Sequence, residues 1–356
     1  MADGTLLNYL TLPNPVLDSS KSSVGPNTFN VSWADVAVLE DWADFDYVTL
    51  MQAHGHVLQQ QVPPMLGTSP PLTRLEKRIF TEKTFEDVLE RAIMLQVSAA
   101  LSVAWPLAYL NHGPEDIAEI GRGDKARKGT AEEDNRYYAD WASIRESQTT
   151  PFGYKNLCPG ETKLASKWGS SKEFWDRPDF QHPFFQIQTY CGRQWDARHG
   201  YIITPEELVV VRVSKEPIGP GLAVSRSIRI KTQSREQPTH SRGPSAETVS
   251  SGPQALTLDT GSRFSDTNPD VEYGPLQFKS IPWSAEGTGK MTVKLALWWL
   301  HMETGKDVSV QNYPPSWTSD DIQTQQTVGN ARGSTPFESH SSTSGPKQKG
   351  KRPARK

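Results

Sequence analysis

The chain has 356 residues, with 26 glycines and 27 prolines, and 35% of its residues are hydrophobic. This low hydrophobic fraction predicts one folded domain of moderate size accompanied by disordered segments. Its two cysteines exclude a disulfide framework and a zinc site built on paired cysteines. Residues 347–356 carry six of the 38 basic residues, which leaves 32 basic and 41 acidic residues elsewhere. This acidic balance excludes a uniformly basic protein that coats nucleic acid. Any contact with nucleic acid must therefore be made by a local groove or by the tail.

The first third of the chain predicts a tail and a long helix. Residues 1–35 are polar and proline-rich, and we expect a flexible segment that lies loose or wraps the surface. Thr84 is expected to cap a helix that runs to about residue 103, with Asp87 as part of an imperfect capping box. The uncharged stretch 92–110 approaches the length of a membrane span, but its polar residues and a proline favour a buried helix. The charged, glycine-rich segment 112–135 predicts a solvated loop or short helix.

The middle of the chain alternates between strands and a helix. Short strands are expected over 137–142 and 157–164, and a helix from about Pro183, since proline is well tolerated in a first helical turn. The segments 201–204 and 208–213 read as the two strands of a hairpin.

The last part of the chain predicts an insertion, a final strand and helix, and a tail. Residues 214–270 lose all periodicity and predict a disordered insertion within a domain that spans 36–304. A strand is expected over 276–283, and a helix over 290–304 with one apolar face. Residues 305–356 predict a disordered, Ser/Thr-rich tail that ends in the basic cluster.

Five residues of the middle region carry the chemistry that the sequence suggests. They are Asp140, Glu161, Lys163, Gln186 and Tyr190. Side chains two residues apart on a strand share a face, so Glu161 and Lys163 are expected side by side, and Asp140 comes from the preceding strand. The two carboxylates are suitable ligands for Mg²⁺ or Mn²⁺. The lysine could orient an attacking water or stabilise the negative charge of a phosphoryl group. Gln186 and Tyr190 lie four apart and share a helix face.

In this order of strands, helix and motifs the chain resembles the PD-(D/E)XK nuclease superfamily, over about 84–213. It is more similar to the exonuclease-type members, in which a Gln-x-x-x-Tyr helix follows the core. The segments PGETKLASKW, YIITPEELVVVRV and MTVKLALWWLHM are also similar to a group of uncharacterised filamentous-fungal proteins, to about residue 304. Ala139 stands where many superfamily members have a proline before the aspartate.

The resemblance implies an α/β fold: an αβββαβ restriction-endonuclease-like core, with a mixed central sheet flanked by helices. It implies a metal-dependent nuclease that hydrolyses the phosphodiester bonds of DNA or RNA, with Asp140 and Glu161 as ligands of Mg²⁺ or Mn²⁺. Lys163 is then the catalytic lysine, with Gln186 and Tyr190 as supports in the active site. An acidic residue of the first core helix often joins the metal, and here either Glu86 or Glu90 could do so.

Plainer interpretations compete with this one. Four of the five residues have a structural explanation on their own: Asp140 as a turn cap, Glu161 and Lys163 as a solvated strand pair, and Tyr190 as a core residue with its hydroxyl at the surface. The main alternative is a catalytically inactive nuclease-fold module that binds nucleic acid or protein, and a third is a membrane-associated protein. No nucleotide cofactor is expected, because a phosphate-binding glycine loop is missing. We expect His182, His199 and His301 to be structural.

Lys167, Arg193 and Arg198 are candidate cations for positioning phosphate, although ordinary surface charge explains them equally well. The chain start lacks the pattern of a secretory signal, so we expect an intracellular protein. The cluster at 347–356 is compatible with nuclear import, with a phosphate-binding tail or with a merely solvated terminus.

Overall fold

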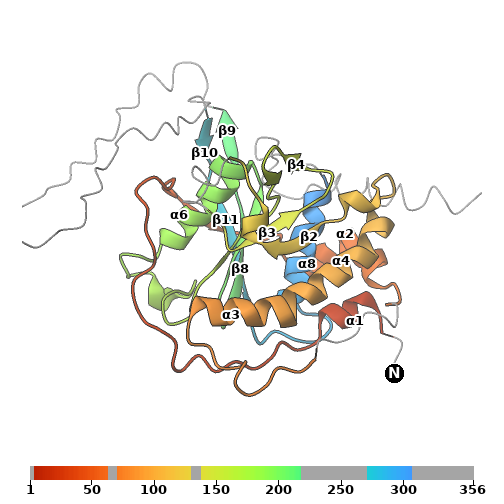
Figure 1. Ribbon diagram of the computed structural model, residues 1–356, viewed down its shortest axis with the longest axis horizontal. Coiled ribbons are helices and arrows are strands. Elements are labelled where there is room, and N and C mark those ends of the chain that lie inside the picture. Colours follow the sequence, from red (N-terminus) through yellow and green to blue (C-terminus); the bar gives the residue numbers. More distant parts are fainter. Residues whose placement is uncertain (1–3, 63–69, 130–137, 218–270, 307–356) are drawn as a thin grey trace, which may run out of the picture. The chain divides into compact units, whose positions relative to one another are not determined.

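The centre of the fold is a mixed seven-stranded sheet (Figure 1). The computed structural model describes residues 4–62, 70–129, 138–217 and 271–306, all of them within one unit, Met1–Tyr313. In spatial order the strands are β1 (Leu39–Asp41), β11 (Leu276–Pro282), β8 (Glu207–Arg212), β7 (His199–Ile203), β6 (Gly160–Thr162), β3 (Trp141–Ile144) and β2 (Glu119–Arg122). A mixed sheet flanked by helices confirms the predicted α/β class.

Most neighbouring strands of the sheet also follow one another along the chain. Strands β2, β3 and β6 are consecutive antiparallel neighbours. The chain then forms helix α6 (His182–Gln188) and returns as β7, parallel to β6, as a helical crossover allows. Strand β8 pairs with β7 as the predicted hairpin, and β11 pairs with β8 as an antiparallel neighbour.

The remaining elements surround this sheet. The helices are α1 (Leu6–Leu10), α2 (Tyr47–Leu58), α3 (Glu82–Leu89), the π-helical turn η1 (Glu90–Met94), α4 (Leu95–Ala108), the π-helical turn η5 (Thr189–Trp195) and α8 (Val293–Glu303). Short 3-10 turns are η2 (Pro114–Asp116), η3 (Gly123–Lys125), η4 (Lys172–Phe174) and η6 (Thr304–Lys306). Two small two-stranded antiparallel sheets pair β4 (Thr149–Thr150) with β5 (Gly153–Tyr154) and β9 (Lys215–Pro217) with β10 (Val271–Tyr273).

Helices cover both faces of the sheet. Successive strand residues point to opposite sides, and nearly all residues of β7 and β8 are buried, so both faces need to be covered. Ile202 and its register partner Val209 belong to the apolar cluster that contains the α6 residues Phe184 and Ile187. The neighbouring residue Tyr201 contacts the ring of His301 on α8, at a centroid distance of 5.9 Å. Helix α6 therefore packs on one face, whereas α8 packs on the other, together with α4 and α2.

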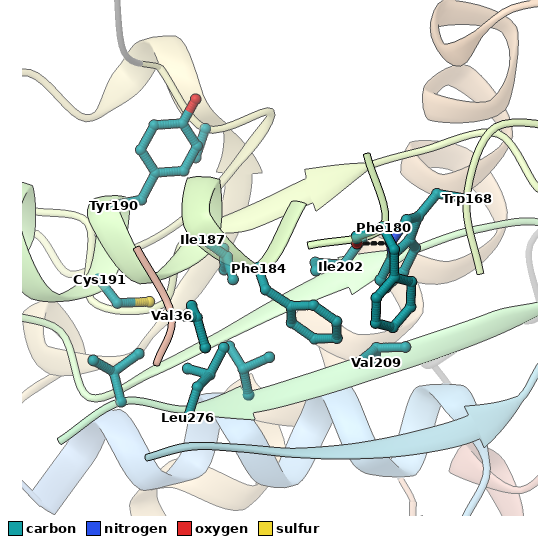
Figure 2. Packing of buried hydrophobic residues seen from close by; sticks show 13 residues of the cluster. Val36, Trp168, Phe180, Phe184, Ile187, Tyr190, Cys191, Ile202, Val209 and Leu276 are labelled. Atoms are coloured by element: carbon teal, nitrogen blue, oxygen red, sulfur yellow. Dashed lines mark hydrogen bonds between the residues drawn. The ribbon is translucent and has the colours of Figure 1, made fainter. Parts of the chain in front are cut away.

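Figure 2 shows the apolar cluster on the α6 face. Trp168 and Phe184 meet edge to face, and the indole Nε1 of Trp168 donates a 2.9 Å hydrogen bond to the carbonyl oxygen of Phe180. Tyr190 lies at the margin of the cluster, and its hydroxyl points away from the other side chains. The cluster thus fixes α6 and η5 against the sheet and leaves one polar group at its edge.

The long helix begins earlier than the sequence predicts. Its N-cap is Thr81, and Thr84 is the third helical residue, whose hydroxyl completes a capping box with Thr81. By length and composition alone, the helix Glu82–Ala108 could cross a membrane. Its residues Ile93, Leu101 and Trp105 are nevertheless buried, as expected of a core helix.

Segment 112–135 contains a strand that the sequence did not predict. Strand β2 pairs along its whole length with β3, from Glu119 opposite Ile144 to Arg122 opposite Trp141. The expected strand 157–164 is shorter in the structure, where β6 covers Gly160–Thr162. The expected strand 137–142 is displaced towards the C-terminus: β3 covers Trp141–Ile144, so Asp140 lies immediately before the strand and not within it.

At the two ends of the domain, the N-terminal segment adopts one of the two expected arrangements, whereas the last helix differs from expectation. Residues 4–35 lie against the domain, with Leu6 and Leu10 of α1 buried, so this segment wraps the surface. Helix α8 is buried on every side, and not on one face alone, because it lies between the sheet and α4. Most of the predicted insertion, residues 218–270, and the tail beyond residue 306 lie outside the described residues.

Candidate active site

The candidate site lies where β3 begins and β6 ends. Trp141 is the register partner of Gly160, so the preceding residue Asp140 lies opposite Glu161 across the antiparallel pair. The backbone amide of Thr162 donates a 2.7 Å hydrogen bond to Oδ2 of Asp140. Glu161 is in turn in register with Ile202, which belongs to the α6 face. Both carboxylates therefore lie on the face that α6 covers.

Glu161 and Lys163 form a buried ion pair. The Nζ of Lys163 lies 2.6 Å from Oε1 of Glu161, and the two residues are 3% and 5% exposed. Glu161 lies on β6 and Lys163 follows its last residue, and their spacing of two residues along the extended chain explains why they share a face. A buried pair of this kind costs desolvation energy and contributes little to stability, so it suggests another use.

Gln186 and Tyr190 reach the same place from the other side. The Nε2 of Gln186 donates to the hydroxyl of Tyr190 at 3.0 Å, and this hydroxyl donates to the carbonyl oxygen of Tyr138 at 3.2 Å. The Gln186 side chain also interacts with Glu161. Tyr190 therefore has an apolar ring in the core of the α6 face and a hydroxyl at the site, on a π-helical turn of a kind often found at functional sites.

The charges of the site perturb one another strongly. Burial, and secondly the Glu161 carboxylate, raise the pKa of Asp140 well above its usual range, against the opposing effects of Lys163 and the Thr162 amide. Burial also raises the pKa of Glu161, although Lys163 and Gln186 lower it in part. Burial disfavours the ammonium of Lys163, but the carboxylate of Glu161 outweighs it and raises the pKa of this lysine. Two carboxylates and one cation thus leave the site short of positive charge.

Two buried oxygens of the site have no hydrogen-bond partner within the part of the chain that the structure describes. They are Oε2 of Glu161 and Oε1 of Gln186. Buried polar atoms are normally paired, so unpaired acceptors beside two carboxylates fit an added cation. Within the described residues, no group of three or more His, Cys, Asp or Glu side chains could by itself hold a metal. Asp140 and Glu161 therefore fit an ion such as Mg²⁺, which binds through one or two carboxylates and completes its shell with water and phosphate oxygens.

Helix α3 adds acidic residues near the site. Of the two acids left open by the sequence, Glu86 raises the pKa of Asp140, whereas Glu90 is bonded to Arg122 at 2.8 Å. Glu86 is also paired with Arg122. The sequence interpretation missed Glu82, which faces Glu161 and Lys163 and lies 3.3 Å from the Nζ of Lys167. The spacing of four between Glu82 and Glu86, which places both on one helix face, was the available signal.

The other candidate residues lie elsewhere, apart from Lys167. Arg193 donates to the carbonyl oxygen of Ser32, and Arg198 lines a different pocket. The histidines contact structural groups: His182 stacks on Phe29, His199 stacks on Trp42, and Nδ1 of His301 is 2.7 Å from the carbonyl oxygen of Leu297.

Comparison of the chain with protein-family models, with curated proteins and with solved structures gives no match. The functional argument therefore depends on the residues and their geometry alone.

Proposed function

We propose that this protein is a metal-dependent nuclease that hydrolyses the phosphodiester bonds of nucleic acid. The observation that carries the proposal is the half-buried carboxylate of Asp140 beside the buried pair of Glu161 and Lys163, in which one oxygen of Glu161 has no hydrogen-bond partner among the described residues. Two perturbed carboxylates and a lysine at one sheet end favour phosphoryl chemistry over a structural role.

The order of elements supports the finer proposal of a restriction-endonuclease-like core in the PD-(D/E)XK superfamily. A helix is followed by three antiparallel strands, a second helix and a strand parallel to the third. This αβββαβ order, with Asp140 before the second strand and Glu161 and Lys163 on and just after the third, agrees with the motif spacing. Strand β2 is the first of these three strands, and it is the one that the sequence did not predict.

Asp140 and Glu161 would hold Mg²⁺ or Mn²⁺, because both residues offer hard oxygen ligands and their mutual repulsion would fall on binding. When bound, such an ion polarises a phosphoryl oxygen and makes a bound water more acidic. Metal binding requires ionised carboxylates, so the raised pKa of Asp140 predicts that affinity falls as the pH falls.

Each protein group has a role in this proposal. The ion pair with Glu161 keeps Lys163 charged and fixes its position, so that its ammonium can stabilise charge on the phosphoryl group or orient the attacking water. Gln186, tied to Tyr190, orients Glu161. The Thr162 amide fixes the carboxylate of Asp140.

The proposal is tested with purified full-length protein and a mixture of single- and double-stranded DNA and RNA. Cleavage is measured with Mg²⁺, with Mn²⁺ and with EDTA. We expect metal-dependent cleavage that is lost in Asp140→Asn, an isosteric change whose amide oxygen can still accept from Thr162. The matched control is Asp41→Asn on edge strand β1, which removes only a surface ion pair with Lys279 and should retain full activity.

Folded protein that cuts none of these substrates with either metal would overturn the proposal. Binding of nucleic acid without cleavage would then favour an inactive nuclease-fold module, for which metal should have no effect.

A further inference from the structure

A polar pocket of about 290 Å³ opens at the end of the sheet away from the candidate active site. Arg145 follows β3 and His199 begins β7, whereas Asp140 precedes β3 and Lys163 follows β6. Because β3 is antiparallel to β6, and β7 is parallel to it, the pocket and the candidate active site lie at opposite strand ends. At ~3.3 Å per strand residue, Asp140 and Arg145 are about 16 Å apart along β3.

Three cationic side chains from three separate segments line this pocket. They are Arg145 after β3, Lys155 after β5 and Arg198 before β7. Arg145 is 2% exposed, its Nη2 donates to the carbonyl oxygen of Thr304 at 2.8 Å, and its guanidinium lies over the ring of Trp105. A buried guanidinium held in this way is already ordered for binding an anion.

The acidic residues of the pocket compensate these cations only in part. Glu303 is bonded to Lys306 at 2.8 Å, to the indole of Trp299 and to His54. Asp196 is exposed at the pocket mouth. Outside the lining, Asp116 interacts with Arg145 from the surface. The described lining thus holds three cationic side chains against two acidic ones, and Glu303 is engaged by Lys306.

His199 supplies a neutral polar group to the same lining. Its ring stacks on the ring of Trp42 at a centroid distance of 5.6 Å. The guanidinium carbon of Arg212 lies over the same Trp42 ring, 4.7 Å from its centroid. Burial, together with Arg198, Arg212 and Lys306 and against Glu303, lowers the pKa of His199 well below its usual range. A neutral imidazole can donate one hydrogen bond without adding charge.

We propose that this pocket binds a phosphomonoester anion no larger than a mononucleotide, at a site separate from the Asp140 carboxylates. Guanidinium and ammonium groups that converge from three segments suit the dianionic phosphate and its several acceptor oxygens. The volume is at the lower end of small-ligand pockets, which suits a small molecule better than a polynucleotide. This site does not depend on the proposed nuclease activity.

The test is calorimetric titration of the full-length protein, at low ionic strength, with adenosine 5′-monophosphate, inorganic phosphate and adenosine. We expect the two phosphates to bind and adenosine not to bind. Lys155→Gln and Arg198→Gln should each weaken binding about tenfold or more, the usual effect of losing one charge-assisted hydrogen bond. Equal affinity for adenosine 5′-monophosphate and inorganic phosphate would mean that the pocket recognises the phosphate group alone, and this result would also support the proposal.

Matched controls separate the pocket from other sources of binding. Lys290→Gln and Arg74→Gln remove exposed cations elsewhere and should leave affinity unchanged. Asp140→Asn should also leave it unchanged, since that residue lies at the other strand end. Failure of both phosphates to bind, or binding that survives Lys155→Gln and Arg198→Gln, would overturn the proposal. Tight binding of a single-stranded oligonucleotide without binding of the monophosphate would overturn it equally.

Discussion

The backbone amide of Thr162 donates a 2.7 Å hydrogen bond to Oδ2 of Asp140. Thr162 is the residue between Glu161 and Lys163, so the same three residues that present the buried ion pair also hold the opposing carboxylate. The indole of Trp141 bonds back to the hydroxyl of Thr162 at 2.9 Å, on the other face of the sheet. The positions of Asp140 and Glu161 are therefore coupled through the backbone, and a change at either strand end moves both.

Asp140→Asn should abolish metal-dependent cleavage without loss of stability. The pKa of Asp140 is raised, so its stabilising contribution is present at low pH and is lost as the pH rises through the folded-state pKa. Above its unfolded-state pKa the Asp140 carboxyl therefore destabilises the metal-free protein, and asparagine removes this cost. We expect an equal or higher melting temperature for the variant at neutral pH, and a difference that shrinks as the pH falls.

Metal binding by Asp140→Asn can be measured through the melting temperature, without an assay of activity. Millimolar Mg²⁺ or Mn²⁺ should raise the melting temperature of the wild-type protein by mass action, and should not raise that of Asp140→Asn. The Asp41→Asn control should respond to metal as the wild type does. A large drop in the melting temperature of Asp140→Asn without metal would contradict the assignment of this residue as a destabilising charge.

Much of the sheet follows from local sequence signals. The hairpin of β7 and β8 is a pair of apolar, β-branched runs around a short turn, so it was predicted nearly residue by residue. Strand β2 was missed because its four residues, EIGR, contain two charges and a glycine. It becomes a strand through pairing with β3, and such tertiary context is not visible in a single segment.

In the candidate site, too, local sequence signals predict some of the contacts and miss another. The pairing of Glu161 with Lys163 follows from strand alternation, and that of Gln186 with Tyr190 from helix periodicity. The proximity of Glu82 depends on where the N-terminus of α3 lies relative to β6, which is tertiary information. A cap placed at Thr84 left Glu82 outside the predicted helix, so this acid was missed.

The buried ion pair predicts strong energetic coupling between Glu161 and Lys163. Lys163→Met leaves a carboxylate buried without its counter-charge, and Glu161→Gln leaves a buried ammonium, so each should destabilise by about 3–5 kcal/mol. The double variant should lose much less than the sum. Urea denaturation of the four proteins measures the coupling, and additivity within about 0.5 kcal/mol would argue against it. The cost of Lys163→Met should also shrink at acidic pH, where Glu161 takes up a proton.

Gly160→Ala should destabilise the fold through the ring of Tyr201. A Cβ at position 160 would lie 2.2 Å from Cζ of Tyr201, its register partner on β7. Tyr201 is fully buried against His301, so its ring has little room to move. We expect a loss of about 1–3 kcal/mol in the free energy of unfolding, the usual cost of overpacking. In a Tyr201→Leu background the same glycine substitution should cost clearly less, and an equal cost in both backgrounds would exclude this clash as the cause.

Glu303 predicts a specific loss of stability in acid. Its carboxylate is buried, and although burial opposes ionisation, Lys306 and His54 lower its pKa from 4.5 to about 2. A carboxyl whose pKa is lowered on folding stabilises above its unfolded pKa, and this stabilisation disappears as the pH falls from about 4.5 towards 2. At 1.36 kcal/mol per pKa unit the effect is about 3 kcal/mol.

The comparison of wild type with Glu303→Gln isolates this contribution. The variant should be less stable than the wild type at neutral pH, because Lys306 loses its counter-charge and glutamine cannot replace the ionic hydrogen bonds to His54 and Trp299. The two stability curves, measured by urea denaturation, should converge as the pH falls through this window. Glu286→Gln, an exposed change in the loop before α8, is the matched control and should follow the wild-type curve throughout. Curves that stay parallel down to pH ~2 would mean that Glu303 stabilises the fold by packing and not by its charge.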